Sequence, residues 1–279
     1  MTTPSKEEPS WGSSYRLVAS EKWKAKSAAM GKAVTEALVQ YAQPRSGMRV
    51  LDLATGTGEP AISIAMIVGA QGQVTALDLS ADLLEIAKGR AQERGLRNFF
   101  TRQADAHALP FADSSFDLAT SRFGIMFFRD PCQALGELRR VLRDKSRACF
   151  LAWGSFDQPY WQTTIGVAHR HVGGSLLEPG GPDPFRFATS GSLSAVLSDA
   201  GFREVHEETK NLSWTWPGTP QEVWEQVRAV SVPFRPMLDR VPANLWPQID
   251  AEVLAAIGQY VQGESIAFGA SVVLASGRK

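Results

Sequence analysis

The sequence predicts an α/β protein built on a parallel sheet with helices on both faces. Two observations predict it. Short apolar segments of strand length alternate with segments whose apolar residues recur at helical spacing, and glycine-containing turns join them. Such alternation favours parallel pairing, with each helix crossing one face of the sheet. At 279 residues the chain can form one large α/β core with a lid or small subdomain.

The first half of the chain repeats the order strand, turn, helix. Apolar residues at helical spacing over 25–41 predict a leading helix that ends before Pro44. The strands expected after it are residues 48–54, 73–78, 98–102, 116–121 and 148–153. The helices between them are residues 60–68, opened by proline, 81–94, which Ser80 can cap, and 131–142.

The second half departs from this alternation. Residues 154–188 are rich in Gly, Pro and aromatic residues, and we expect a long loop or lid there. Helices are expected at residues 190–200, 221–230 and 243–261, and strands at 205–214 and 266–275. The predicted parts are a leader with lid helices (1–43), a core (44–218) with the loop 154–188, a helical insertion or lid (219–262) and a final core strand (263–279).

Composition and charge argue against several classes of function. Lys plus Arg and Asp plus Glu number 29 each, so the chain has no net charge that would attract nucleic acid. Cys132 and Cys149 lack the spacing of a metal or redox motif. No stretch is apolar and long enough to span a bilayer, and the polar start lacks a secretory signal. We therefore expect a cytoplasmic protein without integral membrane association.

Residues 52–59, Asp-Leu-Ala-Thr-Gly-Thr-Gly-Glu, join the first core strand to its helix. Glycines let the backbone turn sharply and approach a ligand, and free amides at the helix start suit an electron-rich group. Alone, this loop indicates only a nucleotide-like site. Residues 56–61 also fit a relaxed dinucleotide fingerprint, so a nicotinamide-dependent oxidoreductase is the alternative.

Three acidic residues at successive strand ends favour one cofactor. Asp78 ends the second strand about 20 residues beyond the loop, where a carboxylate can accept hydrogen bonds from both ribose hydroxyls. Asp52 lies just before the glycines, where its charge would disfavour a diphosphate but suit the ammonium of a methionine moiety. Asp105 follows the third strand and can accept a hydrogen bond from an adenine amino group. Together they favour S-adenosylmethionine.

Four motifs then occur in a recognisable order: Val50-Leu-Asp-Leu-Ala-Thr-Gly-Thr-Gly, Ala76-Leu-Asp-Leu-Ser, Ala104-Asp-Ala with Leu109-Pro-Phe, and Ser115-Phe-Asp. Over residues 48–154 the chain resembles class I S-adenosylmethionine-dependent methyltransferases of the ubiquinone and menaquinone biosynthesis type. The resemblance implies a Rossmann-like, doubly wound sheet of seven strands, the last one antiparallel. It also implies S-adenosyl-L-methionine as methyl donor and S-adenosyl-L-homocysteine as product.

The resemblance assigns cofactor-binding residues in four groups. They are Asp52, Ala54, Thr55, Gly56, Thr57 and Gly58 for the methionine end, Asp78 with Leu79 and Ser80 for the ribose and adenine, Asp105 and Ala106 for the adenine edge, and Ser121 beside the sulfonium. Ala54 stands where the family usually has its first loop glycine, a departure that some quinone-type members share.

A sulfonium is already activated, so no nucleophilic triad is required, and direct in-line displacement onto oxygen, carbon or nitrogen suffices. A general base could be His169, His171 or His206, and we assign none of them. His169 and His171 have no carboxylate or cysteine nearby at ligand spacing, so no metal site is predicted. We interpret His107 as a surface loop histidine.

The acceptor is expected to be a small apolar or aromatic molecule. In related enzymes the leading helix and the insertion before the last strand shape its site, which makes Trp23, Met30, Phe123, Trp161, Phe185 and Phe187 pocket candidates. A non-catalytic, cofactor-binding partner subunit is a further alternative. The identity of the acceptor, the atom methylated and the oligomeric state stay open, a homo-oligomer being one alternative.

Overall fold

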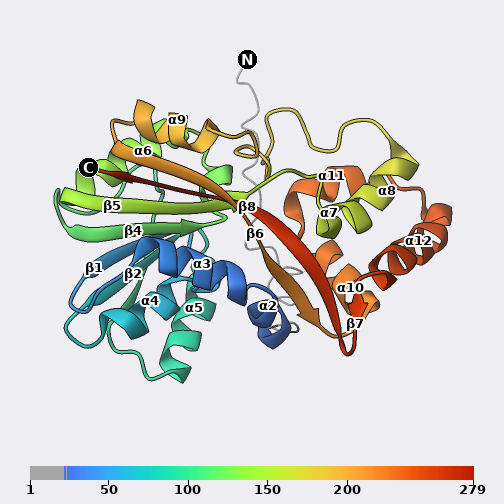
Figure 1. Ribbon diagram of the computed structural model, residues 1–279, viewed down its shortest axis with the longest axis horizontal. Coiled ribbons are helices and arrows are strands. Elements are labelled where there is room, and N and C mark those ends of the chain that lie inside the picture. The colour runs from blue at the N-terminus through green and yellow to red at the C-terminus, as the bar shows by residue number, and fades with distance from the viewer. Residues whose placement is uncertain (1–21, 23) are drawn as a thin grey trace, which may run out of the picture.

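The structure is a computed structural model that describes residue 22 and residues 24–279 (Figure 1). Its centre is an eight-stranded sheet of order β3-β2-β1-β4-β5-β8-β6, and the short strand β7 pairs with β8. The strands are β1 (Arg49–Leu53), β2 (Gln73–Asp78), β3 (Phe99–Gln103), β4 (Phe116–Arg122), β5 (Leu142–Trp153), β6 (Arg203–Pro217), β7 (Val261–Gln262) and β8 (Ser265–Arg278).

The first five strands are parallel, and β8 lies antiparallel between β5 and β6. The doubly wound α/β fold with an antiparallel last strand is thereby confirmed. The strand β7, two residues long, was not predicted, because its pairing with β8 depends on a hairpin and not on an apolar pattern.

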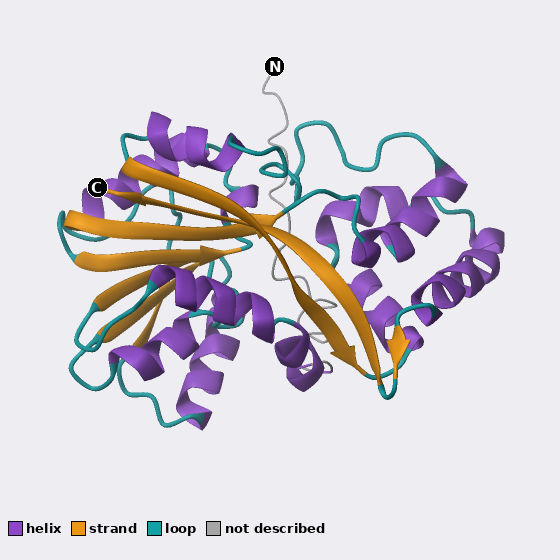
Figure 2. Cartoon of the chain, viewed as in Figure 1, coloured by secondary structure: helices purple, strands orange, loops and turns teal. Residues whose placement is uncertain are grey.

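Helices cover both faces of the sheet, as Figure 2 shows. From β1 the chain runs outward through β2 to β3, and from β4 it runs the opposite way to β5. Since crossovers between parallel strands are right-handed, this reversal puts the two sets of helices on opposite faces. One face carries α3 (Lys32–Ala42), α4 (Ala61–Val68) and α5 (Ala81–Glu93), and the other carries α6 (Pro131–Val141) and α9 (Ser192–Asp199).

The leading helix differs from its prediction. The single helix expected over 25–41 is divided at Gly31 into α2 (Lys24–Met30) and α3. A side chain at Gly31 would crowd its surroundings, because a Cβ there would lie 3.1 Å from the guanidinium of Arg122 and 3.3 Å from the carbonyl oxygen of Ser27. The crowding explains why glycine suits this position, and its low helix propensity favours the break there.

The loop expected over 154–188 also differs. It contains α7 (Pro159–Thr163) and α8 (Ile165–Val172), so the prediction is wrong for residues 159–172. Pro159 occupies the first turn of α7, where proline suits a helix, and buried Tyr160, Trp161 and Ile165 anchor the pair of helices. The Gly, Pro and aromatic content of the segment indicated a loop. That prediction failed for residues 159–172 because Tyr160 and Trp161 are buried and hold this part of the chain against the core as helices.

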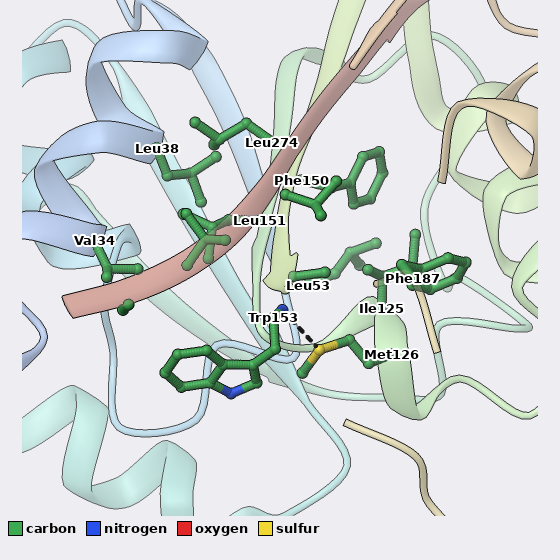
Figure 3. Packing of buried hydrophobic residues seen from close by; sticks show 14 of the residues in the cluster. Val34, Leu38, Leu53, Ile125, Met126, Phe150, Leu151, Trp153, Phe187 and Leu274 are labelled. Carbon is green, nitrogen blue, oxygen red and sulfur yellow. Dashed lines mark hydrogen bonds between the residues drawn. The ribbon is translucent and has the colours of Figure 1, made fainter. Parts of the chain in front are cut away.

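The core is formed by side chains from both faces of the sheet (Figure 3). Val34 and Leu38 of α3 pack close to Leu151 of β5 and Leu274 of β8. Neighbouring Phe150 points the other way, as the alternation of side chains along a strand requires. The sheet is therefore buried on both faces, which leaves the ends of its strands as the places where ligands can reach it.

Beyond Trp153 and Val272, the last paired residues of β5 and β8, only β6 and β7 pair with β8. The two long strands thus leave the core as a ribbon and reach a separate group of helices, which we call the helical lobe (Figure 1). It consists of α7, α8, α10 (Pro220–Val230), α11 (Arg235–Leu238) and α12 (Trp246–Gly258). Short 3₁₀ turns lie at Ile125–Phe127, Val232–Phe234 and Ala243–Leu245.

None of the helices within the described residues combines the length and the apolar composition that crossing a membrane would need.

Candidate functional site

A cavity of about 1660 Å³ opens at the carboxyl ends of β1, β2, β3 and β4. The strand order reverses between β1 and β4, and ligands of open α/β sheets bind at such a switch point. On its other sides the cavity is bounded by α2, the start of α3, residues 178–183 and α10. Since sites for one small ligand have volumes of roughly 300–1,000 Å³, this cavity has room for two ligands.

The loop between β1 and α4 forms the floor of the cavity, through Ala54, Thr55, Gly56 and Thr57. Ala54 has a φ of 51° and Gly56 a φ of 56°, in the left-handed region. A Cβ added at Gly56 would meet nothing within 4 Å, so the backbone faces open space there. A ligand can consequently approach the main chain closely, at a conformational cost at Ala54 of about 1–2 kcal/mol.

Asp78 lines the cavity and holds this loop in place. Its Oδ2 accepts a hydrogen bond from the backbone N–H of Gly56 (2.8 Å), and its Oδ1 accepts one from Ser80 (3.0 Å). The residue is only 8 % exposed. Each carboxylate oxygen has a further lone pair, so the same group can accept hydrogen bonds from a ligand.

Asp105 and His107 form a hydrogen-bonded pair in the wall. Asp105 Oδ1 accepts from the backbone N–H of His107 (2.9 Å) and lies 2.5 Å from His107 Nδ1. His107 Nε2 accepts from the backbone N–H of Asp130 (3.1 Å), which requires the proton to be on Nδ1. Burial favours the neutral form of Asp105, but the hydrogen bonds from His107 outweigh it and hold the pKa of Asp105 below its usual range.

The interpretation of His107 as a surface loop histidine is therefore wrong. Its side chain is 10 % exposed and lines the cavity. Both ring nitrogens are engaged, so His107 positions Asp105 and is unsuited to accept a proton from a ligand. The sequence could not show this, because one of its partners, Asp130, is 23 residues away at the start of α6.

Asp52 is fully buried at the end of β1 and does not line the cavity. Its Oδ1 accepts a hydrogen bond from Thr120 Oγ1 (2.7 Å), and its Oδ2 has no donor among the described residues. Burial raises the pKa of Asp52 to about 7, although the hydroxyls of Thr120 and Thr55 and the positive charge of Arg122 act in the opposite direction. The protein thus keeps an acidic group where its charge is costly.

Leu79 and Ala106 line the cavity near the two acids. Leu79 is 50 % exposed, which is unusual for a large apolar side chain next to a strand end. Three other residues assigned to the cofactor do not line the cavity and make local contacts instead. Gly58 packs against Ile62, Ser80 caps α5 by accepting from the N–H of Leu83, and Ser121 Oγ donates to the carbonyl of Leu53.

Among the acceptor candidates, Phe123 lines the cavity. Its φ is 58°, and its ring stacks on Trp153 with centroids 4.4 Å apart. The remaining candidates within the described residues lie in the core or in the aromatic cluster behind the cavity and do not line it: Met30, Trp161, Phe185 and Phe187. Trp23 lies outside the described residues.

The three histidines considered as a general base lie away from the cavity. His169 Nε2 is 2.9 Å from the carbonyl oxygen of Gly174, and His171 Nε2 is 2.8 Å from Glu252 Oε2. His206 lies on β6 in a separate surface groove beside Tyr41. The structure brings none of them to the acceptor side, and within residues 22 and 24–279 no group of three His, Cys, Asp or Glu side chains could hold a metal ion.

Sequence reasoning missed Arg122, Thr35 and Gln226, which line the cavity. Arg122 Nη1 donates to Thr35 Oγ1 (2.6 Å), and Gln226 of α10 is buried with its Oε1 3.5 Å from Tyr160 Oη. The signal available for Arg122 was a charged residue directly after the expected strand 116–121, at the same edge as Asp52 and Asp78.

Comparison with known proteins gives three findings. Residues 44–155 match a family model described as a methyltransferase domain. The chain is 43 % identical over 122 residues to ubiquinone/menaquinone biosynthesis C-methyltransferase UbiE of Bdellovibrio bacteriovorus, a match covering 44 % of this chain and 51 % of that protein. It is 34 % identical over 180 residues to demethylmenaquinone methyltransferase of Lactiplantibacillus plantarum, covering 60 % of this chain and 75 % of that protein.

The chain thus spans about half the length of the first relative and three quarters of the second. Among solved structures, a SAM dependent methyltransferase from Aquifex aeolicus matches with a TM-score of 0.52 at 22 % identity, over 67 % of this chain and 89 % of that one. This likeness shows that the two chains share a fold. The family model ends at residue 155, so the whole helical lobe lies outside it.

Proposed function

The chain belongs to the S-adenosylmethionine-dependent methyltransferases, and we propose that it transfers a methyl group from this cofactor to the ring of a small, largely apolar acceptor of the quinone type. The observation that carries the proposal is the cavity, which has cofactor-type groups at the strand ends and an apolar wall formed mainly by residues 123–128 after β4.

The residues at the strand ends fit S-adenosylmethionine. The open backbone at Gly56 would receive the methionine portion, and the free lone pairs of Asp78 would accept from the ribose hydroxyls. Exposed Leu79 offers an apolar surface for the adenine ring, whose amino group Asp105 would bind. Asp52 would act on the cofactor's positive charge through space, because it is buried beneath the loop.

When bound, the cofactor supplies a methyl group already activated by positive sulfur. The tasks left to the protein are to hold the acceptor in line with that methyl group and to exclude water. The apolar side of the cavity suits both tasks. Phe123, Met126, Phe127 and Phe128 line it from the segment after β4, and Val230 lines it from α10.

The proposal of a quinone-type acceptor rests on this apolar wall and on the names of the two relatives. The test is incubation of the protein with methyl-labelled cofactor and either demethylmenaquinol or a metabolite extract, with labelled products read by mass. A labelled ring compound is expected. A labelled product of another chemical class would show that the acceptor is not of the quinone type. Cofactor binding without any labelled product would favour a non-catalytic subunit.

The cofactor site has its own prediction. Asp78→Ala removes the carboxylate that also holds the β1–α4 loop. Loss of one charge-assisted hydrogen bond from the ribose, worth about 1.5–3 kcal/mol, should lower the affinity for S-adenosyl-L-homocysteine by at least about 10–100-fold. Calorimetric titration measures it, with Asp82→Ala on the exposed start of α5 as the matched control. Unchanged affinity in Asp78→Ala would remove this residue from the site, and tight binding of NAD would restore the oxidoreductase alternative.

A further inference from the structure

Arg122 lies where the sheet side of the cavity meets α3. It is the last residue of β4, and the chain after it packs tightly against the β1–α4 loop. A Cβ added at Gly124 would lie 2.5 Å from Ala54 Cβ and 2.6 Å from Ser121 Oγ. The guanidinium reaches across to Thr35 of α3 and lines the cavity. Arg122 is thus placed by rigid elements on both sides.

Within the part of the chain that the structure describes, most of the N–H donors of Arg122 have no acceptor. A guanidinium has five N–H groups in a fixed fork, and the structure gives this one a single hydrogen bond, from Nη1 to Thr35 Oγ1 at 2.6 Å. The Nε atom is buried and has no acceptor among the described residues. Thr35 itself donates to the carbonyl of Gly31 (3.0 Å), which turns its oxygen lone pairs toward Arg122 and fixes the fork.

The nearby carboxylates do not complete the fork, because among the described contacts neither Asp52 nor Glu59 accepts a hydrogen bond from Arg122. Asp52 Oδ1 accepts from Thr120 instead, and Glu59 Oε2 accepts from the hydroxyl of Ser63 (2.6 Å). Burial lowers the pKa of Arg122, while Glu59 and Asp52 act in the opposite direction. The carboxylates of Glu59 and Asp52 thus offset part of the charge of Arg122 through space, and they leave its remaining N–H groups open to a ligand. The cavity therefore contains a partly buried cation with free donors.

We propose that Arg122 binds an anionic oxygen of a ligand in this cavity, by the paired hydrogen bonds that a guanidinium makes with an oxyanion. Two ligands could supply that oxygen. One is the acceptor, bound with an ionised ring hydroxyl, and the other is the carboxylate of the cofactor's methionine portion. This inference rests on the proposed function for the identity of the ligands, but the chemistry that it names is a property of Arg122 and its surroundings.

The acceptor source has a chemical consequence. An ionised hydroxyl makes a ring richer in electrons, and a cation beside it favours the ionised form. The described residues that line the cavity include one imidazole, His107, and both of its nitrogens are engaged. Binding by Arg122 would favour the ionised acceptor, whose hydroxyl proton would pass to solvent water, so no imidazole is needed to accept it.

The experiment uses two probe pairs and equilibrium binding, without turnover. In each pair one member can present an anionic oxygen, which we call the anionic probe, and its neutral partner cannot. The pairs are 4-nitrophenol with 4-nitroanisole, and S-adenosyl-L-homocysteine with 5′-methylthioadenosine, which lacks the amino-acid portion. Arg122→Met removes the charge, and Arg122→Lys keeps the charge without the fork. Arg94→Met, an exposed arginine at the rim of the same cavity, is the control for the change in net charge.

Arg122→Met should lower the binding affinity for at least one anionic probe about 10–100-fold. The affinity for its neutral partner should stay within about twofold of the wild-type value. Arg122→Lys should give a smaller loss. Loss of 4-nitrophenolate affinity, with a higher pKa of the bound phenol by absorbance, identifies the acceptor as the source. Loss of S-adenosyl-L-homocysteine affinity identifies the cofactor carboxylate.

The proposal is overturned if the wild-type protein prefers neither anionic probe over its neutral partner, or if folded Arg122→Met binds both anionic probes as the wild type does. Circular dichroism reports folding, and if Arg122→Met is unfolded, the same comparison is made with Arg122→Lys, where unchanged affinity for both anionic probes also overturns it. These results are independent of methyl transfer. A protein that forms no labelled product but binds an anionic probe through Arg122 would disprove the proposed function alone.

Discussion

The buried carboxyl of Asp52 gives a prediction whose size follows from its surroundings. Its pKa is about 7, roughly three above the ordinary value of 3.8. Below about pH 3 the carboxyl is protonated in both states and costs nothing. As the pH rises toward 7, the unfolded chain ionises freely while the folded protein keeps the proton, so the folded state loses stability. The loss reaches about 4 kcal/mol above pH 7 and then stays constant.

Asp52→Asn removes this ionisation and keeps the shape. Its carbonyl can still accept from Thr120, but its amide N–H groups would take the position of Oδ2, which has no partner among the described residues, at a cost of about 1–3 kcal/mol. At pH 8 the variant should therefore exceed the wild type in unfolding free energy by about 1–3 kcal/mol. At pH 5 this advantage should be smaller by about 2.5 kcal/mol, because most of the wild-type penalty is then absent.

Urea denaturation of both proteins at pH 5 and pH 8 measures the two differences, and Asp82→Asn serves as an exposed control. If the advantage of Asp52→Asn changes by less than about 0.5 kcal/mol between the two pH values, Asp52 is not a buried acid with a raised pKa, and the reasoning above is wrong. A stabilised variant with weakened cofactor affinity would show that the carboxyl is retained for binding.

Further predictions concern close packing around the cavity. Gly124→Ala should lower the unfolding free energy by about 1–3 kcal/mol, because its Cβ would overlap Ala54 and Ser121, whereas Gly136→Ala, inside α6 with open space around its Cβ, should raise it by about 0.5–1 kcal/mol. The unfolding free energy of Trp161→Phe should stay within about 1 kcal/mol of the wild type. The change loses some ring volume, but it also removes an indole N–H that has no acceptor within the described residues. Trp161→Ala should lower the unfolding free energy by about 3–5 kcal/mol, because it leaves a cavity in the core. Chemical denaturation measures all four, and a destabilised Gly136→Ala or a Trp161→Phe that unfolds readily would contradict the respective argument.

The strands and the β1–α4 loop could be predicted because their signals are local. Apolar runs of strand length and a glycine turn are visible within a few residues, and Asp52, Asp78 and Asp105 follow from the ends of those runs. The acceptor side could not be predicted in the same way. Helical spacing identified an apolar face on the leading helix, but it did not show that Met30 points into the core while Ser27, Ala28 and Ala29 line the cavity.

Contacts between distant segments account for the other differences. His107 gains its role from Asp130, and Arg122 from Thr35 across 87 positions of the chain. We expected Trp161, Phe185 and Phe187 to line the pocket because they are aromatic. The aromatic side chains of this segment instead contact β6, through Tyr160 and Trp214, and Phe234 next to α11, through Trp161. The residue types predicted that these side chains would be buried, but the residues that they contact are determined by the tertiary structure.

The ribbon formed by β6 and β8 has a mechanical consequence. Residues 265–271 of β8 extend past the last pair with β5, a length of about 23 Å at roughly 3.3 Å per residue. An arm of that length displaces its tip by about 0.4 Å for each degree of bend. The arm ends at the helical lobe, whose α10 places Gln226 and Val230 in the cavity opposite the sheet. A bend of about 8° would therefore change the distance between these two walls by about the diameter of a water molecule. The stiffness of two strands would thus help to determine how wide a ligand the cavity can admit.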